Sequence, residues 1–427
     1  MKMFEKILVL DMGGTSIKAG LIRVDGGQIE EDDEWRHEYQ ASDLEDAKSD
    51  LVSKIRSNVC RERETANAVG IAIAGLVADN NSLYRSTVLT SFQGFNLPNF
   101  LKKEFEAKVA TIDNDADCGA ICEWHLRRKN LLYVVVGSGI GSAYIDNKGN
   151  LPYLTRFDLK HQFSDKDNPV PNDLGLQLAI PKEEVYKEFG ESSEVLDRLL
   201  VDSKGSQLRG PGNDSKSIRL GDIASGTGLK RIIDMELFAY SWRNPTQATN
   251  VNLHYRKFPL IKDALKMDKT ALDEKRIAMY LSHTARYKDK FAVRAFEIFG
   301  HFLGYGIAET QKIIREEQNL DELPDTFIGG AITRSYHFFR QPMMEAIAAR
   351  GGNDYVRLSY GRDLSEQRSK HFALMDSVDD HSNLHGAFVQ AYKALLQSEE
   401  NHRLIFENEW REFDPLAEHM WKPLRIR

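Results

Sequence analysis

Residues 6–24 read KILVLDMGGTSIKAGLIRV and carry the strongest fold signal of the chain. The apolar run at residues 6–10 predicts a buried strand, and residues 16–24 alternate as a second strand does. Between them, Asp11–Thr15 places two glycines and a threonine in a turn. Glycines let a backbone approach a phosphate closely and expose consecutive N–H donors. The stretch therefore predicts a strand–turn–strand unit, and by itself it leaves a phosphate-binding turn and a plain hairpin both open.

Two common nucleotide-binding motifs do not describe this turn. It lacks the Gly-Lys-Ser/Thr of a Walker A loop, and it lacks G-x-G-x-x-G and continues into a strand instead of a helix. A phosphate would contact the backbone at Gly13 and Gly14 and the hydroxyl of Thr15. Asp11, at the strand end, is positioned to hold a hydrated Mg²⁺, which keeps several waters and takes one or two carboxylates. Lys18, beyond the turn, fits a solvated strand lysine better than a phosphate ligand.

A second strand–turn–strand pattern follows at residues 131–145. Residues 131–136 form an apolar strand, the turn Gly137-Ser138-Gly139-Ile140-Gly141 follows, and residues 142–145 lead out as a strand. We interpret the two units as a weak internal duplication. A short strand at 326–328 ends in Gly329-Gly330. Glycine-rich hairpins are common, but two of them with a late glycine pair indicate a clamp for the β- and γ-phosphates of a nucleotide, with Gly329 and Gly330 admitting the purine or ribose.

Helical spacing of apolar residues predicts further elements. Helices are expected at 43–64, 116–128, near 182–200, from 225, at 292–315 and at 385–396, and strands at 69–74 and 109–112. The polar stretch 30–38 is expected to form loops or a sheet edge. Gly300, Gly304 and Gly306 in the long helix indicate close packing against another backbone.

Composition sets the class of protein. The chain has 427 residues, 57 basic and 64 acidic side chains, a net charge of −7 and three cysteines. A nucleic-acid partner would call for a basic domain, and no apolar run approaches the ~20 residues that cross a bilayer. The apolar start breaks at Asp11, too early for a signal peptide. We expect a cytoplasmic protein that acts on a small molecule, with no nucleic-acid or membrane partner.

Taken in order, these motifs resemble the sugar kinase, Hsp70 and actin ATPase superfamily, and within it the ROK family of bacterial sugar kinases and repressors. The resemblance covers roughly residues 5–160 and 220–395. It is carried by segments 11–21, 70–77, 114–123, 137–141, 222–227 and 328–330. It implies an α/β fold, a two-lobed actin-like (ribonuclease H-like) ATPase with a central cleft, and a homodimer. The lobes would be 1–127 and 128–427, the second with insertions at about 163–220 and 241–290.

The resemblance also implies site residues and cofactors. ATP and Mg²⁺ would bind at the two phosphate turns. Gly75 stands at the glycine-rich strand end that the family places beside its sugar. Asp158 and His161 fall near the offset of the family's Glu-x-Gly-His motif and would hold sugar hydroxyls, although a loop histidine without a role fits equally. The family's zinc motif, Cys-x-Cys-Gly-x-x-Gly-Cys, is missing, so no zinc is expected. A DNA-binding repressor is not expected, because the phosphate motif begins within the first dozen residues.

The triplet Asp113-Asn114-Asp115 ends a strand and opens a helix. On the triplet alone, a helix N-cap is the better interpretation, since Asp and Asn favour that position. With two phosphate turns in the right order, Asp115 becomes the predicted general base, which accepts a proton from the attacking hydroxyl. Asn114 would hydrogen-bond a sugar hydroxyl. The sequence thus predicts a kinase of a hexose or hexose derivative. A non-catalytic sugar sensor or scaffold, a kinase of a different acceptor, and polyphosphate as the donor stay open.

Overall fold

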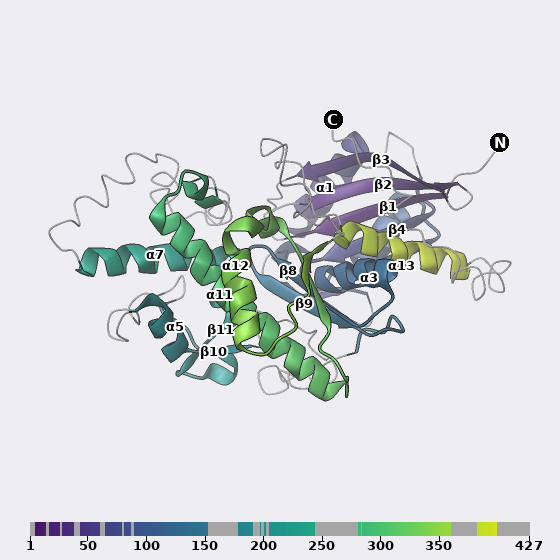
Figure 1. Ribbon diagram of the computed structural model, residues 1–427. Helices are drawn as coiled ribbons and strands as arrows, with labels where there is room; N and C mark the ends of the chain where they lie inside the picture. The colour runs from purple at the N-terminus through teal and green to yellow at the C-terminus, as the bar shows by residue number, and fades with distance from the viewer. Residues whose placement is uncertain are drawn as a thin grey trace. The chain divides into compact units, whose positions relative to one another are not determined.

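The computed structural model forms two compact units (Figure 1). Unit 1 comprises residues 1–133, 143–152 and 359–427, and unit 2 comprises residues 134–142 and 153–358. Strands β8 (Leu131–Val136) and β9 (Ile140–Ile145) run through both units. The structure describes residues 5–13, 17–25, 28–37, 43–59, 65–78, 81–86, 89–152, 178–190, 197, 200–201, 205–243, 281–282, 284–359 and 382–398.

Unit 1 is built on a mixed five-stranded sheet of order β3-β2-β1-β4-β7. Strands β1 and β2 are antiparallel, as the strand–turn–strand pattern predicts, and β1, β4 and β7 are parallel. The polar stretch forms β3 at the sheet edge, in agreement with the second of the two alternatives for it. The strands are β1 (Glu5–Met12), β2 (Ile17–Asp25), β3 (Gln28–His37), β4 (Ala68–Ile73) and β7 (Val109–Asn114), with the separate pair β5 (Leu76–Val77) and β6 (Leu83–Arg85).

Strand β1 is buried on both faces of the sheet. Side chains alternate across a strand, so Ile7 and Val9 join the apolar cluster of α3 (Asp115–Arg127) and α13 (Ser382–Ser398). Leu8 and Leu10 join the cluster of α1 (Leu44–Asn58) and α2 (Leu97–Glu104) on the opposite face. A strand covered on both faces needs a near-continuous apolar run, which is why residues 6–10 dominate the sequence signal.

The place of α13 differs from the expected division of the chain. The second lobe was expected to hold all residues after 127, whereas α13 packs in unit 1. A Cβ on Gly386 would lie 1.8 Å from the carbonyl oxygen of Cys118 in α3. A Cβ on Gly70 of β4 would lie 2.2 Å from the carbonyl oxygen of Ala387. Glycine at these two crossings lets the backbone of α13 lie directly on α3 and on the sheet.

Unit 2 contains the sheet β13-β12-β8-β9 and three long helices. Helix α11 lies against α12 and against α7, and strands β12 and β13 are parallel. The bounds are α7 (Gly226–Arg243), α11 (Lys290–Glu317), α12 (Tyr336–Ala349), β12 (Asp325–Gly329) and β13 (Val356–Leu358), with short 3₁₀ turns η1 (Thr90–Phe92) in unit 1 and η3 (Pro211–Asn213), η4 (Leu220–Asp222) and η6 (Ala331–Ser335) in unit 2.

The described part of the predicted insertion at 163–220 is a folded piece of unit 2. Strand β10 (Ala179–Pro181) pairs with β11 (Ser217–Arg219), and α5 (Lys182–Phe189) lies between them in the chain. Helix α5 ends at Phe189, earlier than predicted, because Gly190 takes the left-handed conformation that stops a helix.

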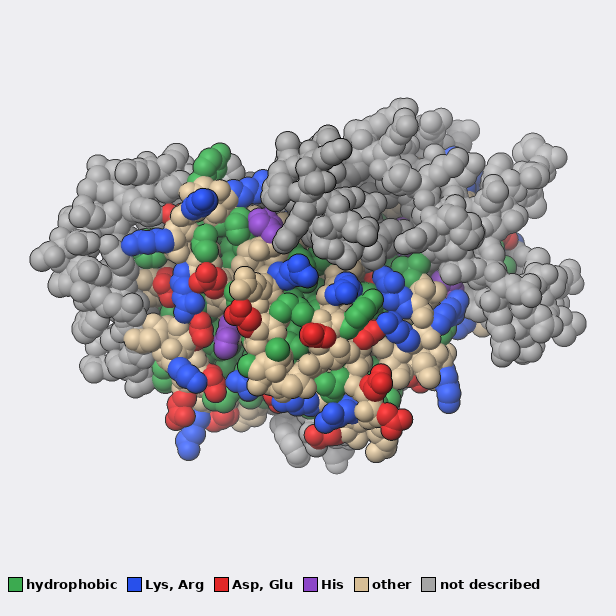
Figure 2. Space-filling model, viewed as in Figure 1, with side chains coloured by type: hydrophobic (Ala, Val, Ile, Leu, Met, Phe, Trp, Pro, Cys, Tyr) green, Lys and Arg blue, Asp and Glu red, His purple; other side chains and the backbone are tan. Residues whose placement is uncertain are grey.

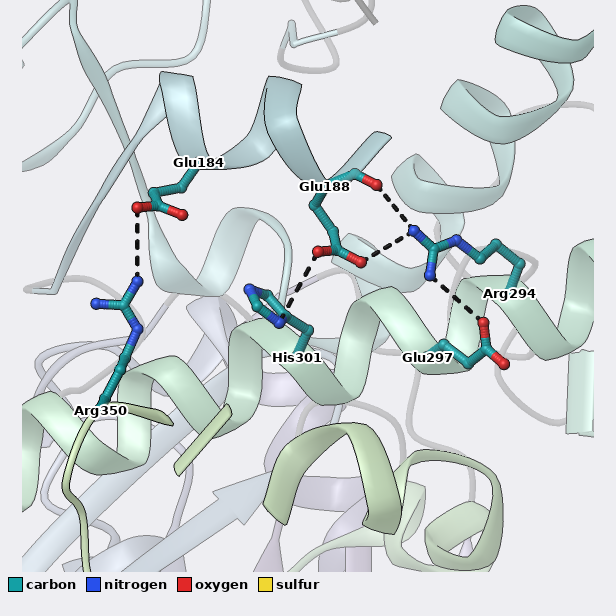
Figure 3. A network of polar contacts seen from close by, with 6 residues as sticks. All are labelled: Glu184, Glu188, Arg294, Glu297, His301 and Arg350. Atoms are coloured by element: carbon teal, nitrogen blue, oxygen red, sulfur yellow. Dashed lines mark hydrogen bonds and ion pairs between the residues drawn. The ribbon is translucent and has the colours of Figure 1, made fainter. Parts of the chain in front are cut away.

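Ion pairs connect α5 to α11 and to the end of α12 (Figure 3). Arg294 Nη2 lies 2.9 Å from Glu188 Oε1, His301 Nδ1 lies 3.9 Å from Glu188 Oε2, and Arg350 Nη2 lies 3.6 Å from Glu184 Oε1. Partly exposed pairs contribute about 0–1 kcal/mol each. The buried side chains of α5, Val185 and Phe189, therefore supply most of its attachment.

The surface offers no single-sign charge patch on the face drawn in Figure 2, where acidic and basic side chains of the described residues are interspersed. Among the helices that the structure describes, none combines the length and the hydropathy that crossing a membrane requires.

Two glycines of α11 lie directly against the backbone of α12, and substituting one of them tests this packing. A Cβ on Gly300 would lie 2.4 Å from the carbonyl oxygen of Phe339, and one on Gly304 would lie 2.3 Å from that of Met343. Both contacts confirm the predicted backbone packing for Gly300 and Gly304, whereas a Cβ on Gly306 would meet the side chain of Leu220 at 2.3 Å, and α12 itself was not predicted. Gly304→Ala should lower the free energy of unfolding by about 2 kcal/mol, because the two helices must separate. Thermal unfolding beside the exposed control Arg315→Ala checks this, and an equally stable Gly304→Ala protein would contradict it.

Candidate active-site residues and related proteins

Four residues form a row across the sheet of unit 1. Lys18 pairs in register with Asp11, Asp11 with Ala72, and Ala72 with Asp113. Asp11, Ala72 and Asp113 lie near the carboxyl ends of the parallel strands β1, β4 and β7, the edge where open α/β sheets bind their ligands, and Lys18 lies beside Asp11 in the antiparallel β2. Asp11 belongs to β1 itself, one step before the turn in which the sequence analysis placed it.

The carboxylate of Asp11 has a different partner on each oxygen. Lys18 Nζ lies 3.5 Å from Oδ2, and Asn383 Nδ2 donates to Oδ1 at 3.5 Å. Asp11 is 8% exposed, and the side chain of Lys18 is 14% exposed, so Lys18 is not the solvated lysine that the sequence suggested. Gly13 directly follows β1, whereas Gly14 and Thr15 lie outside the described residues, and their phosphate contacts stay predictions.

Asn114 is the N-cap of α3, so one member of the triplet has the capping role that the sequence indicated. Its Oδ1 accepts from the backbone N–H of Ala116 at 2.9 Å, and its Nδ2 donates to the carbonyl oxygen of Gly75 at 2.9 Å. The structure therefore brings together the predicted substrate residues Asn114 and Gly75. Asp115 is the first residue of α3, partly exposed, and its Oδ1 also lies 3.0 Å from the N–H of Ala116. Capping does not require Asp115, so its carboxylate can serve another role.

Gly75 is required by the packing around it. A Cβ there would lie 2.7 Å from the carbonyl oxygen of Arg85 and 2.7 Å from Leu83 Cδ1. The β5–β6 pair thus folds directly over the end of β4. Ser86 Oγ fixes the arrangement, because it donates to the carbonyl oxygen of Ala74 at 2.7 Å. This close approach is a structural reason for the glycine that the sequence analysis assigned to substrate binding.

Four carboxylates gather at the head of α3. Burial and the charges of Asp113, Asp117, Asp115 and Asp11 raise the pKa of the buried Cys118 thiol. The pKa of Asp117 is raised well above its usual value by burial and by the charges of Asp113 and Asp115. Burial raises the pKa of Asp113 from 3.8 to about 6, although Gln390 Nε2 of α13 donates to its Oδ2. Burial and mutual repulsion therefore favour the protonated, uncharged form of Asp113 and Asp117, so the four carboxyl groups do not all carry a charge together.

In unit 2, the turn Gly137–Gly139 is fixed by α7. The carbonyl of Gly137 accepts from the N–H of Gly226 at 2.8 Å, and the carbonyl of Ser138 accepts from Thr227 N and Oγ1 at 3.3 and 3.0 Å. In a trans peptide the C=O and the following N–H point in opposite directions. The amides of Ser138 and Gly139 therefore point away from α7.

The glycines of this turn have no packing reason to be glycine. A Cβ on Gly137 or Gly139 would meet nothing within 4 Å among the described residues, and neither residue has a positive φ. Gly330 is different: its φ is 95°, and a Cβ would lie 2.3 Å from the carbonyl oxygen of Val136. Gly329 and Gly330 thus lie against the end of β8, next to the turn, and Gly141 continues in β9. The predicted nucleotide residues of unit 2 are brought together.

Other predicted residues are not tested. Asp158 and His161 lie outside the described residues. Within the part of the chain that the structure describes, no group of three or more His, Cys, Asp or Glu is arranged to hold a metal ion. Asp11 as a single carboxylate fits a Mg²⁺ that keeps most of its waters. Sequence reasoning missed Asn383 and Gln390, because each bonds a residue more than 270 positions away and carries no local signal.

Solved structures of other proteins have a similar architecture. A ROK family glucokinase from Streptomyces griseus, solved with glucose and AMPPNP, superposes with a TM-score of 0.54 at 17% identity and covers 91% of this chain and 99% of its own. A ROK family transcriptional regulator, a homologue of the E. coli MLC protein, superposes with a TM-score of 0.54 at 13% identity, covering 98% of this chain and 81% of its own. The fold class is therefore confirmed as an α/β actin-like ATPase fold.

The sequence comparisons supply the family. The ROK family profile matches residues 7–151, so the predicted resemblance to ROK sugar kinases is confirmed. Polyphosphate glucokinase from Mycobacterium leprae is 27% identical over 148 residues, 34% of this chain and 44% of that protein. The chain matches less than half the length of the curated relatives. The segment that matches the ROK family profile, residues 7–151, contains Asp11, Asn114, Asp115 and the Gly137 turn.

The raised pKa of Asp113 predicts that the stability of the protein depends on pH. The folded protein binds the proton of Asp113 more tightly than the unfolded chain does, so the free energy of unfolding falls as pH rises from about 4 to about 6. Asp113→Asn cannot ionise and should be more stable than the wild type at pH 7.5, by about 1 kcal/mol, with little difference at pH 4. Melting temperatures of the wild type and of Asp113→Asn at both pH values test this prediction, with the exposed substitution Asp354→Asn as the control. A wild type that is the more stable of the two at pH 7.5 would refute the argument.

Proposed function

We propose that this protein is an ATP- and Mg²⁺-dependent kinase that phosphorylates a hydroxyl of a hexose or hexose derivative. One observation carries the proposal: within the segment that matches the ROK family, Asp11 lies near the carboxyl end of β1, Asp115 directly follows the carboxyl end of β7, and Asn114 takes the capping role. The similarity to a polyphosphate glucokinase and to a ROK family glucokinase supports the reaction class.

In this proposal Asp115 is the catalytic base. Phosphoryl transfer to an alcohol needs a carboxylate that accepts the hydroxyl proton as the oxygen attacks the γ-phosphorus. Asp115 stands at the first position of α3, whose N-terminal dipole favours a negative charge there. Asn114 retains one N–H beyond its bond to Gly75, and that N–H can donate to a second sugar hydroxyl. Asp158 and His161 remain the predicted further sugar ligands.

The nucleotide would bind at the backbone donors. The amides of Ser138 and Gly139 point away from α7 and are available to phosphate oxygens, with the Ser138 hydroxyl beside them. Gly13, Gly14 and Thr15 would contact phosphate at the first turn, and Gly329 and Gly330 would border the nucleoside. Mg²⁺ would be held through water by Asp11 and by phosphate oxygens, and it would neutralise charge on the transferring group.

Asp115→Asn tests the base. The amide keeps the size and a hydrogen-bonding oxygen but cannot take a proton, so sugar-dependent ADP release should fall at least 1,000-fold while sugar affinity by calorimetry changes less than threefold. The screen covers hexoses, N-acetylhexosamines and ketoses, with ATP and polyphosphate as alternative donors. The exposed control Asp321→Asn should match the wild type. Undiminished turnover in Asp115→Asn would remove Asp115 from the mechanism.

Gly139→Ala tests whether the Gly137 turn binds phosphate, because the substitution should weaken ATP binding without lowering the stability of the protein. The residue has room for a methyl group, so the melting temperature should stay within about 2 °C of the wild type or rise slightly. A nucleotide phosphate that approaches the backbone would meet the methyl group, so the KM for ATP should rise at least tenfold. Asn147→Ala in the next turn is the matched control. Unchanged ATP affinity would place the nucleotide elsewhere.

A non-catalytic sugar sensor is the second candidate, because the superposition on a ROK family transcriptional regulator is as good as that on the glucokinase. Both candidates bind sugar, and they differ in turnover. Calorimetric binding of a sugar without ADP release in the presence of ATP or polyphosphate would favour the sensor, and stoichiometric sugar phosphate would exclude it.

A further inference from the structure

A continuous chain of hydrogen bonds runs through the interior of unit 1 to Asp11. Ser359 Oγ donates to Glu123 Oε1 at 2.8 Å and lies 2.7 Å from Ser382 Oγ. Ser382 Oγ lies 2.9 Å from the hydroxyl of Tyr133, and that hydroxyl lies 3.3 Å from Asn383 Oδ1. Asn383 Nδ2 then donates to Asp11 Oδ1 at 3.5 Å.

The far end of this chain is rigid. Glu123 is fully buried, and Arg127 Nε, one turn later in α3, lies 3.2 Å from its other carboxylate oxygen. Tyr133 is also fully buried, and its ring packs where a Cβ on Gly119 would stand, 2.1 Å from Cε1. A Tyr ring locked by packing holds its hydroxyl in one place. The start of α13 is therefore fixed by groups of α3 and β8.

The amide of Asn383 has a defined orientation for the same reason. Its oxygen faces the Tyr133 hydroxyl, which leaves its N–H groups to face the carboxylate of Asp11. Asn383 is 8% exposed, so solvent does not readily replace this bond. Lys18 approaches the other carboxylate oxygen, Oδ2, from β2. Asp11 is thus held from two sides, by a neighbour in the hairpin and by a residue of the last described helix.

We propose that Asn383 is a positioning residue for the metal function of Asp11. The inference rests on the proposed kinase, in which Asp11 holds the waters of Mg²⁺. A carboxylate that must hold hydrated Mg²⁺ needs a fixed oxygen direction, and partners behind a metal ligand typically tune affinity 10–100-fold. At 3.5 Å the bond from Asn383 Nδ2 to Asp11 Oδ1 is at the long end of the hydrogen-bond range.

A merely structural role makes a different prediction. If Asn383 only satisfied a buried carboxylate, its loss would lower stability and would leave metal affinity unchanged. The variant Asn383→Leu keeps the size of the side chain, removes the donor and excludes a replacing water. Tyr133→Phe keeps the locked ring and removes the hydroxyl that orients Asn383. Ser398→Ala, at the exposed far end of α13, is the control, since its hydroxyl bonds only the carbonyl of Leu395 among the described contacts.

The experiment measures Mn²⁺ binding by electron paramagnetic resonance in the full-length protein with a non-hydrolysable ATP analogue, beside the Mg²⁺ dependence of sugar phosphorylation. We expect Asn383→Leu to weaken Mn²⁺ binding about tenfold and to raise the KM for Mg²⁺ in parallel, with the KM for sugar unchanged. Tyr133→Phe should weaken Mn²⁺ binding about threefold, and Ser398→Ala should match the wild type. Melting temperatures verify that each variant is folded.

The outcomes separate the two proposals. Wild-type Mn²⁺ affinity in folded Asn383→Leu overturns the positioning role, whatever happens to turnover. A wild type that phosphorylates no sugar overturns the kinase proposal, and the Mn²⁺ titration still decides whether Asn383 orients Asp11. If Asn383→Leu is too unstable to titrate, Asn383→Ser takes its place, and affinity equal to the wild type in both Asn383→Ser and Tyr133→Phe overturns the inference.

Discussion

A carboxylate at the end of a strand that is covered on both faces must find its partners inside the protein, and this constraint organises unit 1. The alternation of β1 sends Ile7, Val9 and Asp11 toward α13. An ionised group in that position is costly unless it is paired and hydrogen-bonded. Lys18 and Asn383 meet the requirement from opposite ends of the chain. The same burial that makes β1 a core strand therefore forces its last polar residue into a fixed geometry.

The local part of this arrangement could be predicted from the sequence. The apolar run before Asp11, the alternation after it and the Asp113-Asn114-Asp115 triplet gave the strands, the helix and the candidate base, because each pattern reflects contacts within a few residues. The sequence could not tell which member of the triplet caps α3. That choice depends on Gly75, whose carbonyl lies 2.9 Å from Asn114 Nδ2 and reaches it only through the pairing of β4 with β7.

The long-range part could not be predicted. Helix α13 was expected from its apolar spacing, yet nothing local assigns it to unit 1. Its position depends on glycines that meet backbone, Gly386 on α3 and Gly70 on β4, and a glycine in a sequence does not name its neighbour. Asn383 follows from that docking, since its bond to Asp11 spans 372 positions. Lys18 was misjudged for a related reason: its burial comes from β1 and from the elements that cover the sheet, not from its own flanks.

Contacts made by main-chain atoms are compatible with a sequence that differs at most positions from those of proteins with a similar fold. Asp11, Asn114, Asp115 and the Gly137 turn lie within residues 7–151, the part that matches the ROK family, whereas Gly329 and Gly330 lie outside it. Part of what orients the Gly137 turn lies outside that segment and acts through main-chain atoms, as when the N–H groups of Gly226 and Thr227 in α7 donate to the carbonyls of Gly137 and Ser138. Main-chain donors are present whatever the side chain, so such contacts constrain the path of the chain and leave its residues free to change.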